Sequence, residues 1–122
     1  MVIHAALQDD IAQLSPSYLV RYLIDVVGAP LVAVMAGVRS AGEVERWSSG
    51  QQAPEPDAER RLRDAYRVVQ TLLEADGPDV VRGWLIGMNP MLEDQAPGLV
   101  LADDPDSVLF AARAYRYGQM GA

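Results

Sequence analysis

The side chains that most often perform enzyme chemistry are scarce in this sequence. Its 122 residues include no cysteine and no lysine, and the single histidine, His4, lies close to the N-terminus. Thiol nucleophiles and Schiff-base lysines are therefore excluded, and a Ser-His-Asp triad has no well-placed histidine. Zinc sites, which need cysteines or several histidines, are excluded as well. The sequence predicts no catalytic residue, no metal site and no cofactor.

One group of acids has the composition of a cation site. Asp103, Asp104 and Asp106 are close enough in sequence to suggest ligands for a divalent ion. The alternative is that they lie at the start of a helix, where the positive end of the helix dipole favours carboxylates. The pair Asp104-Pro105 is typical of such a start, because Asp caps the helix and Pro fits its first turn. The sequence therefore favours the helix start.

Charge is distributed unevenly along the chain. All ten basic residues are arginines, and they face 17 acids, which gives a net charge of −7. In residues 29–70 six arginines balance six acids, whereas residues 71–122 have three arginines, eight acids and a net charge of −5. The last third would repel phosphate, so we expect that only the middle third could contact DNA.

No targeting or membrane-spanning segment is recognisable. The first ten residues lack basic side chains and turn acidic at Asp9 and Asp10, unlike a signal peptide. The longest apolar run, residues 26–38, has 13 residues and includes two glycines and a proline. A helix that crosses a bilayer needs about 20 apolar residues. We expect a cytoplasmic protein that does not enter a membrane.

Apolar spacing and helix-ending residues predict an all-α fold of about seven helices. No stretch alternates between apolar and polar residues as a half-buried strand would. Trp47 and Trp84 are expected to be buried, one in each half of the chain. The expected helices lie between Ser15 and Gly28, over Leu31–Ala36, from Ser40 to Gly50, from a cap at Asp57 to Gly77, over Val80–Ile86, from Asn89, and from Asp104.

Residues 31–54 have the layout of a helix-turn-helix. A short helix is followed by a turn at Gly37-Val38 and by a second helix whose start, Ser40 to Glu43, is a capping box. The glycine permits the sharp reversal of the chain, and apolar residues on the second helix would hold it against the first. The sequence predicts two short helices that pack across a tight turn.

This layout leaves two interpretations of the second helix open. Arg39, Ser40 and Arg46 would lie where a recognition helix contacts bases and phosphates. Glu43 and Glu45 belong to the same helix and would oppose phosphate. The unit therefore either contacts operator DNA or serves only as a scaffold, and the two glutamates favour the scaffold.

Two motifs resemble known families and together cover about residues 16–118. The Gly37-Val38-x-Ser40 turn and the segment Arg46-Trp47-Ser48-Ser49-Gly50 resemble the Xre family of phage-repressor-like domains. Residues 83–92, Gly-Trp-Leu-Ile-Gly-Met-Asn-Pro-Met-Leu, and Pro97-Gly98-Leu99-Val100 resemble the C-terminal domain of the MbcA/ParS/Xre antitoxins. The acidic loop and last helix of that family correspond to residues 103–118. The glycines that the family usually shows near Asp94 and in the acidic loop are absent here.

The resemblance implies the antitoxin of a type II toxin–antitoxin system. Residues 1–14 would be a flexible segment, 15–75 an Xre-like helix-turn-helix region and 76–122 the toxin-binding domain. The partner would be a RES-domain toxin that degrades NAD, with its NAD pocket blocked by the antitoxin's C-terminal end, and we expect a homodimer. The alternative is a stand-alone helix-turn-helix repressor. The residues expected to contact the toxin are Met88, Asn89, Arg113, Tyr115, Arg116, Tyr117 and Met120.

Overall fold

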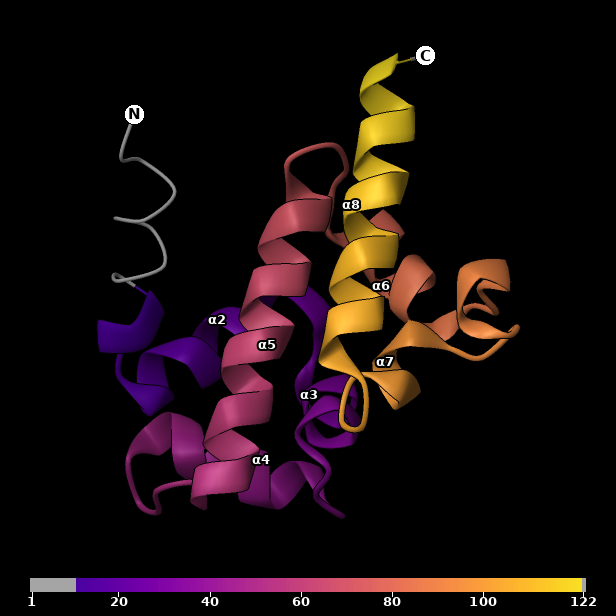
Figure 1. Cartoon of the computed structure of the whole chain (residues 1–122). Helices are drawn as coiled ribbons and strands as arrows, with labels where there is room; N and C mark the ends of the chain where they lie inside the picture. The colour runs from indigo at the N-terminus through magenta and orange to yellow at the C-terminus, as the bar shows by residue number, and fades with distance from the viewer. Residues whose placement is uncertain (1–10, 122) are drawn as a thin grey trace.

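Helices make up most of the computed structural model, which describes residues 11–121 and, for residues 119–121, only the backbone (Figure 1). This part of the chain contains no strand, and an isolated β-bridge joins Asn89 to Gln95. The all-α prediction is confirmed. The helices are α2 (Pro16–Val27), α3 (Ala29–Ala36), α4 (Ala41–Ser49), α5 (Pro56–Leu73), α6 (Pro78–Ile86), η1 (Pro90–Leu92), α7 (Pro97–Val100) and α8 (Pro105–Gly121).

The first two predicted helix caps are present. The backbone N–H of Tyr18 donates to the Ser15 hydroxyl at 3.2 Å and caps α2. The backbone N–H of Glu43 donates to the Ser40 hydroxyl, also at 3.2 Å, and caps α4. Each bond satisfies a donor that the first turn of a helix otherwise leaves free. Local signals were therefore sufficient to place these two helix starts.

The predicted cap of the longest helix is wrong. Helix α5 begins at Pro56, whose fixed φ suits the first helical position. Asp57 lies inside the first turn, and its carboxylate pairs with Arg60 at 3.2 Å. The helix also ends earlier than expected, at Leu73, and Pro78 begins α6 instead of ending α5.

Helix α5 lies at the centre of the fold. It packs against α2, α3, α6 and α8. In Figure 1, α5 and α8 lie side by side and run in the same direction, and α8 also contacts η1 and α7. One cluster of buried apolar residues extends from Val20 in α2 to Ala112 in α8. The regions 15–75 and 76–122 therefore share one hydrophobic core.

Arginine side chains close the C-terminal ends of several helical segments. In α2, α3 and α4 the guanidinium donates to a carbonyl of the last turn that has no intrahelical partner, and its charge complements the helix dipole. Because these arginines donate to backbone carbonyls within the fold, we do not count them as cations free to bind a partner. The four bonds are Arg21 to Ser48 O (3.3 Å), Arg61 to Ala36 O (3.4 Å), Arg63 to Ile11 O (2.6 Å) and Arg82 to Val26 O (3.0 Å).

The two tryptophans differ in burial. Trp47 is 2% exposed and belongs to the core, as predicted. Trp84 is partly exposed and packs against the edge of this core, so the prediction of burial is met less completely for Trp84 than for Trp47. The reason is the orientation of α6, which directs Val81 and Leu85 into the core and leaves Trp84 on the flank of the helix.

The N-terminal segment is described only in part. His4 and the rest of residues 1–10 lie outside the described residues. Ile11, within the segment 1–14 that was expected to be flexible, is buried with Leu19 and Tyr66. Within the described part of the chain, no helix has the length and apolar character needed to cross a bilayer.

Candidate partner-binding site

A groove of about 400 Å³ lies between α8 and the segment that joins α6 to α7. Side chains from two stretches, residues 84–91 and residues 111–115, come together in it. Most of them are apolar, and none is charged. The lining residues are Trp84, Met88, Asn89, Pro90, Met91, Ala111, Ala114 and Tyr115.

A short hydrogen-bonded loop shapes one wall of this groove. The Asn89 side chain accepts from the Met91 N–H at 2.9 Å and caps η1, as the sequence predicted. The Asn89 N–H donates to the Gln95 carbonyl at 3.2 Å, and buried Leu92 anchors the loop to the core. With the backbone fixed in this way, Met88 and Met91 are left 81% and 53% exposed.

Two aromatic rings pack together beside the loop. The ring centroids of Trp84 and Tyr115 are 6.2 Å apart and the rings are inclined by 53°, a favourable tilted arrangement. Interaction of the Tyr115 hydroxyl with the Asp76 carboxylate, followed by burial, raises the pKa of Tyr115. The tyrosine hydroxyl is therefore protonated at neutral pH, and the pair presents rigid, uncharged rings to the groove.

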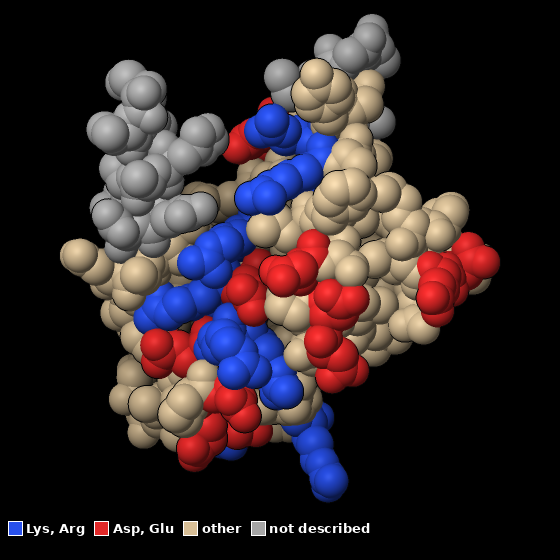
Figure 2. Space-filling view, viewed as in Figure 1, with Lys and Arg blue, Asp and Glu red and all other residues tan. Residues whose placement is uncertain are grey.

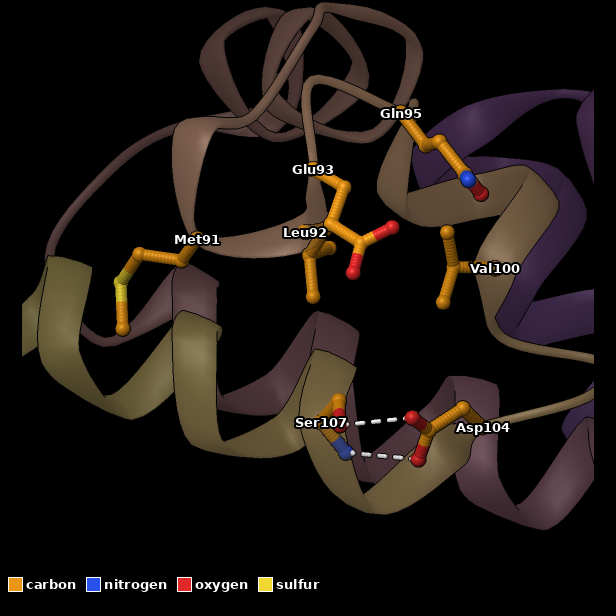
Figure 3. A pocket seen from close by; sticks show the side chains of 7 residues that line it. All are labelled: Met91, Leu92, Glu93, Gln95, Val100, Asp104 and Ser107. Atoms are coloured by element: carbon orange, nitrogen blue, oxygen red, sulfur yellow. Dashed lines mark hydrogen bonds between the residues drawn. The ribbon is translucent and has the colours of Figure 1, made fainter.

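A second pocket of about 230 Å³ continues along the same flank of α8 and shares Met91 with the first (Figure 3). Here the lining is more polar. Asp104 accepts hydrogen bonds from the Ser107 N–H at 3.2 Å and the Ser107 hydroxyl at 2.7 Å. These bonds favour the carboxylate and lower the pKa of Asp104. The pocket is lined by Met91, Leu92, Glu93, Gln95, Val100, Asp104 and Ser107.

Two residues at the rim of this pocket have left-handed backbone conformations. Glu93 has a φ of 58° and Asp94 a φ of 63°. Such angles are uncommon for residues other than glycine. Both residues therefore meet a steric cost that glycine would avoid at these positions. In Figure 3 the Glu93 side chain projects toward α8 and into the pocket.

The outer face of α8 carries an exposed apolar stripe. Phe110 is 67% exposed and Tyr117 is 76% exposed, and Ala114 lies between them on the same helical face. Large apolar side chains gathered on a surface commonly mark a contact with another molecule. The stripe borders the groove, because Ala114 belongs to both.

The structure brings together part of the set expected to bind a toxin. Met88, Asn89 and Tyr115 line the same groove. Trp84 and Met91 also line it, although sequence reasoning did not select them as site residues. Both residues belong to the 83–92 motif, which could have identified them. Trp84 is instead predicted to be a core residue because of its residue type alone.

The remaining members of that set lie elsewhere. The Arg116 guanidinium forms an ion pair with Glu74, on the flank of α8 that faces the end of α5. Arg113 and Tyr117 are exposed on α8 and do not line the groove. The side chain of Met120 lies outside the described residues. The expected site is therefore split between a groove and the end of a helix.

The turn between α3 and α4 requires a glycine. Gly37 has a φ of 75°, and a Cβ at this position would lie 2.7 Å from Nη1 of Arg61. Helix α4 then begins at the Ser40 cap and packs against α3 through Val44 and Trp47. The geometry is that of two short helices joined by a tight turn.

Of the three residues proposed to contact DNA, two have bonds within the chain. Ser40 caps α4, and the Arg46 Nε–H donates to the Gln52 side chain at 3.1 Å. Arg39 is exposed and has no hydrogen-bond or ion-pair partner among the described residues. Glu43 is half-exposed on the same helix and adds negative charge.

The groove and the neighbouring pocket provide a surface that another molecule could bind. In residues 11–121, no three His, Cys, Asp or Glu side chains are grouped so that they could hold a metal ion. Comparison of the chain with protein-family models, with curated proteins and with solved structures gives no match. Fold and site together define an all-α protein with an exposed groove beside its last helix.

Proposed function

We propose that the chain is an antitoxin that binds and neutralises a RES-type, NAD-degrading toxin. The observation that carries the proposal is the groove, where residues of the 83–92 motif and of α8 form one exposed, mainly apolar surface. Exposed apolar surface of this kind commonly marks a contact with another molecule. The class of the partner comes from the sequence resemblance over residues 16–118.

The free end of α8 is the segment we assign to the toxin's NAD pocket. Figure 1 shows its C-terminal turns projecting past the end of α5. Tyr117 is 76% exposed there, and its ring and hydroxyl suit a pocket built for flat rings and polar groups. Exposed Arg113 can pair with a carboxylate at the pocket wall. Arg116 is held by Glu74 and would instead fix the position of the helix.

Co-expression tests this proposal. A RES-type toxin expressed alone should deplete cellular NAD and stop growth, and co-expression of this chain should restore both. The two proteins should also elute together in size-exclusion chromatography. NAD depletion that persists while immunoblots show both proteins at comparable levels contradicts the proposal.

We also propose that the antitoxin is a homodimer and that a second groove makes the contact. This groove, about 190 Å³, lies between α3, α6 and α7, and exposed Ile86 and Leu99 border it. No lining residue is charged, which suits contact between copies that each carry a net charge of −7. Sedimentation should give a dimer for the wild type and a monomer for Leu99→Asp, and a wild-type monomer contradicts the assignment.

Operator binding is a second candidate function. It is favoured by Arg39, an exposed arginine at the start of α4 whose guanidinium has no partner in the described part of the chain. Against it, six acids balance the six arginines of residues 29–70. Gel shifts on the DNA upstream of the gene, with affinity that falls steeply as salt rises, would support this function.

A further inference from the structure

The two pockets beside α8 differ in polarity and form one continuous surface. The pocket that contains Trp84 has no charged lining residue, whereas the neighbouring pocket contains Glu93 and Asp104. Neither pocket has a basic lining residue. Asp94 and Asp103 are exposed close by in the chain and add to the same charge. Figure 2 shows acidic side chains over the start of α8 and on the loop to its right, while the arginines form a band over α5.

The shape of the surface suits a helix. Asp104, Ser107, Ala111 and Ala114 line the two pockets at spacings of three and four residues, which is the pattern of a helix face that packs against another helix. From Asp104 to Tyr115, α8 spans about 16 Å at the usual rise per residue, which is about three helical turns. A short helix laid along this flank would cover both pockets.

Charge complementarity determines the composition of that helix. Glu93 is kept in a left-handed conformation, and its carboxylate projects over a pocket whose other acid, Asp104, has a lowered pKa. Both carboxylates line the same pocket, so a basic side chain is favoured between them. At the other end, the rings of Trp84 and Tyr115 favour apolar side chains.

We propose that this surface receives an amphipathic helix of the protein partner, with an apolar stripe over Trp84 and Ala114 and an arginine or lysine over Glu93 and Asp104. This inference rests on the proposed antitoxin function and specifies the chemistry of the toxin segment that the chain recognises. The helix end that carries the basic residue lies at the start of α8.

The affinity of the full-length chain for the purified RES-type toxin tests the proposal. Glu93→Gln with Asp104→Asn removes both charges, and asparagine preserves the helix cap. We expect about ten-fold weaker binding, mainly through slower association, and a shallower salt dependence. The matched control is Asp25→Asn with Glu45→Gln, which makes the same charge change on exposed helix positions of the other half. It should bind within about two-fold of the wild type.

The apolar part of the surface is tested separately. Ala114→Glu keeps a good helix former at an exposed position but places a charged side chain in the apolar groove, so binding should weaken at least about 30-fold. Ala53→Glu, also exposed, is its control. Phe110→Ala is a second variant that should weaken binding without introducing a charge.

Each outcome decides between the two proposals. If the wild type binds the toxin and the groove variants bind equally well, the helix site is wrong while the antitoxin function stands. Tighter binding after removal of the two charges shows that the partner segment is not basic. A change in the mass of the free chain caused by Ala114→Glu assigns the surface to a second copy and overturns the proposal. Failure of the folded wild type to bind any RES-type toxin overturns both.

Discussion

Trp47 and Trp84 differ in how much of each indole ring is removed from water. Replacing each with alanine should therefore lower the free energy of unfolding by a different amount. Trp47 is 2% exposed, so Trp47→Ala should lower the free energy of unfolding by about 3–5 kcal/mol. Trp84→Ala should lower the free energy of unfolding by only about 1–2 kcal/mol, because Trp84 is half-buried and less apolar area returns to water. Urea unfolding measures both values. Equal losses would contradict the different placement of the two rings.

The left-handed conformation of Glu93 gives a second prediction at this scale. Glycine adopts a φ of 58° without the steric cost that a side chain meets, so Glu93→Gly should raise the free energy of unfolding by about 0.5–1 kcal/mol. The same change removes one carboxylate from the acidic pocket and should weaken toxin binding. A destabilised variant would show that contacts of the Glu93 side chain hold the loop.

The contributions of Asp104 and Asp64 to the stability of the fold should change with pH in opposite directions. Hydrogen bonds from Ser107 lower the pKa of Asp104, so its contribution to stability is present above the usual aspartate value of about 3.9 and is lost as pH falls through the lower folded value. Burial raises the pKa of Asp64 despite Arg67, so its contribution is full below about 3.9 and is lost as pH rises through the raised folded value.

Thermal unfolding of two variants checks these signs. Asp64→Asn should raise the melting temperature at pH 7 relative to the wild type, and the difference should vanish near pH 3. Asp104→Ala should lower the melting temperature at pH 7, again with a smaller difference at pH 3. A stabilising Asp104→Ala would contradict its role as the cap of α8.

At the scale of the elements, the helices themselves could be predicted from the sequence because their signals are local. Ser15, Ser40 and Asn89 each accept the backbone hydrogen bond expected of a cap. Which exposed residues of α6 and α8 meet in one groove could not be predicted, because that depends on how the helices pack against one another. Helix α8 directs Ala112 toward the core, and this rotation brings Arg116 to Glu74 and away from the groove.

The same limit applies to the candidate site. Met88 and Asn89, two residues of the 83–92 motif, both line the groove. Trp84 was assigned to the core because large aromatic residues are usually buried. Only the orientation of α6, with Leu85 directed inward, shows that Trp84 belongs to the groove wall.

Helix α4 carries the prediction for DNA. If it contacts an operator, Arg39→Ala with Arg46→Ala should abolish binding, because these are the cations at its start and on its outer face. Glu43→Gln with Glu45→Gln should strengthen binding by removing repulsion from phosphate. Gel shifts at several salt concentrations measure both effects. No change in either variant would leave α3 and α4 as a scaffold.

At the scale of the whole molecule, one core joins the helices of both halves, and the arginine bonds strengthen this connection. Arg82 of α6 donates to Val26 O in α2. This hydrogen bond directly connects the region that contains the groove with the region that contains the turn between α3 and α4. Among residues 105–118 of α8, the buried ones are Val108, Ala111 and Ala112. A chain truncated after Ala112 retains all three and should remain folded, which circular dichroism can verify first.

The most direct test of the account is the rate at which a purified RES-type toxin consumes NAD in the presence of this protein. One equivalent of the full-length chain should stop NAD consumption. One equivalent of the folded chain truncated after Ala112 should leave most of the activity, because the truncation removes Tyr117 together with Ala114 and Tyr115 of the groove. Undiminished NAD consumption by toxin that is fully bound to the full-length chain would contradict the account. Complete inhibition by the truncated chain would contradict the role assigned to the end of α8.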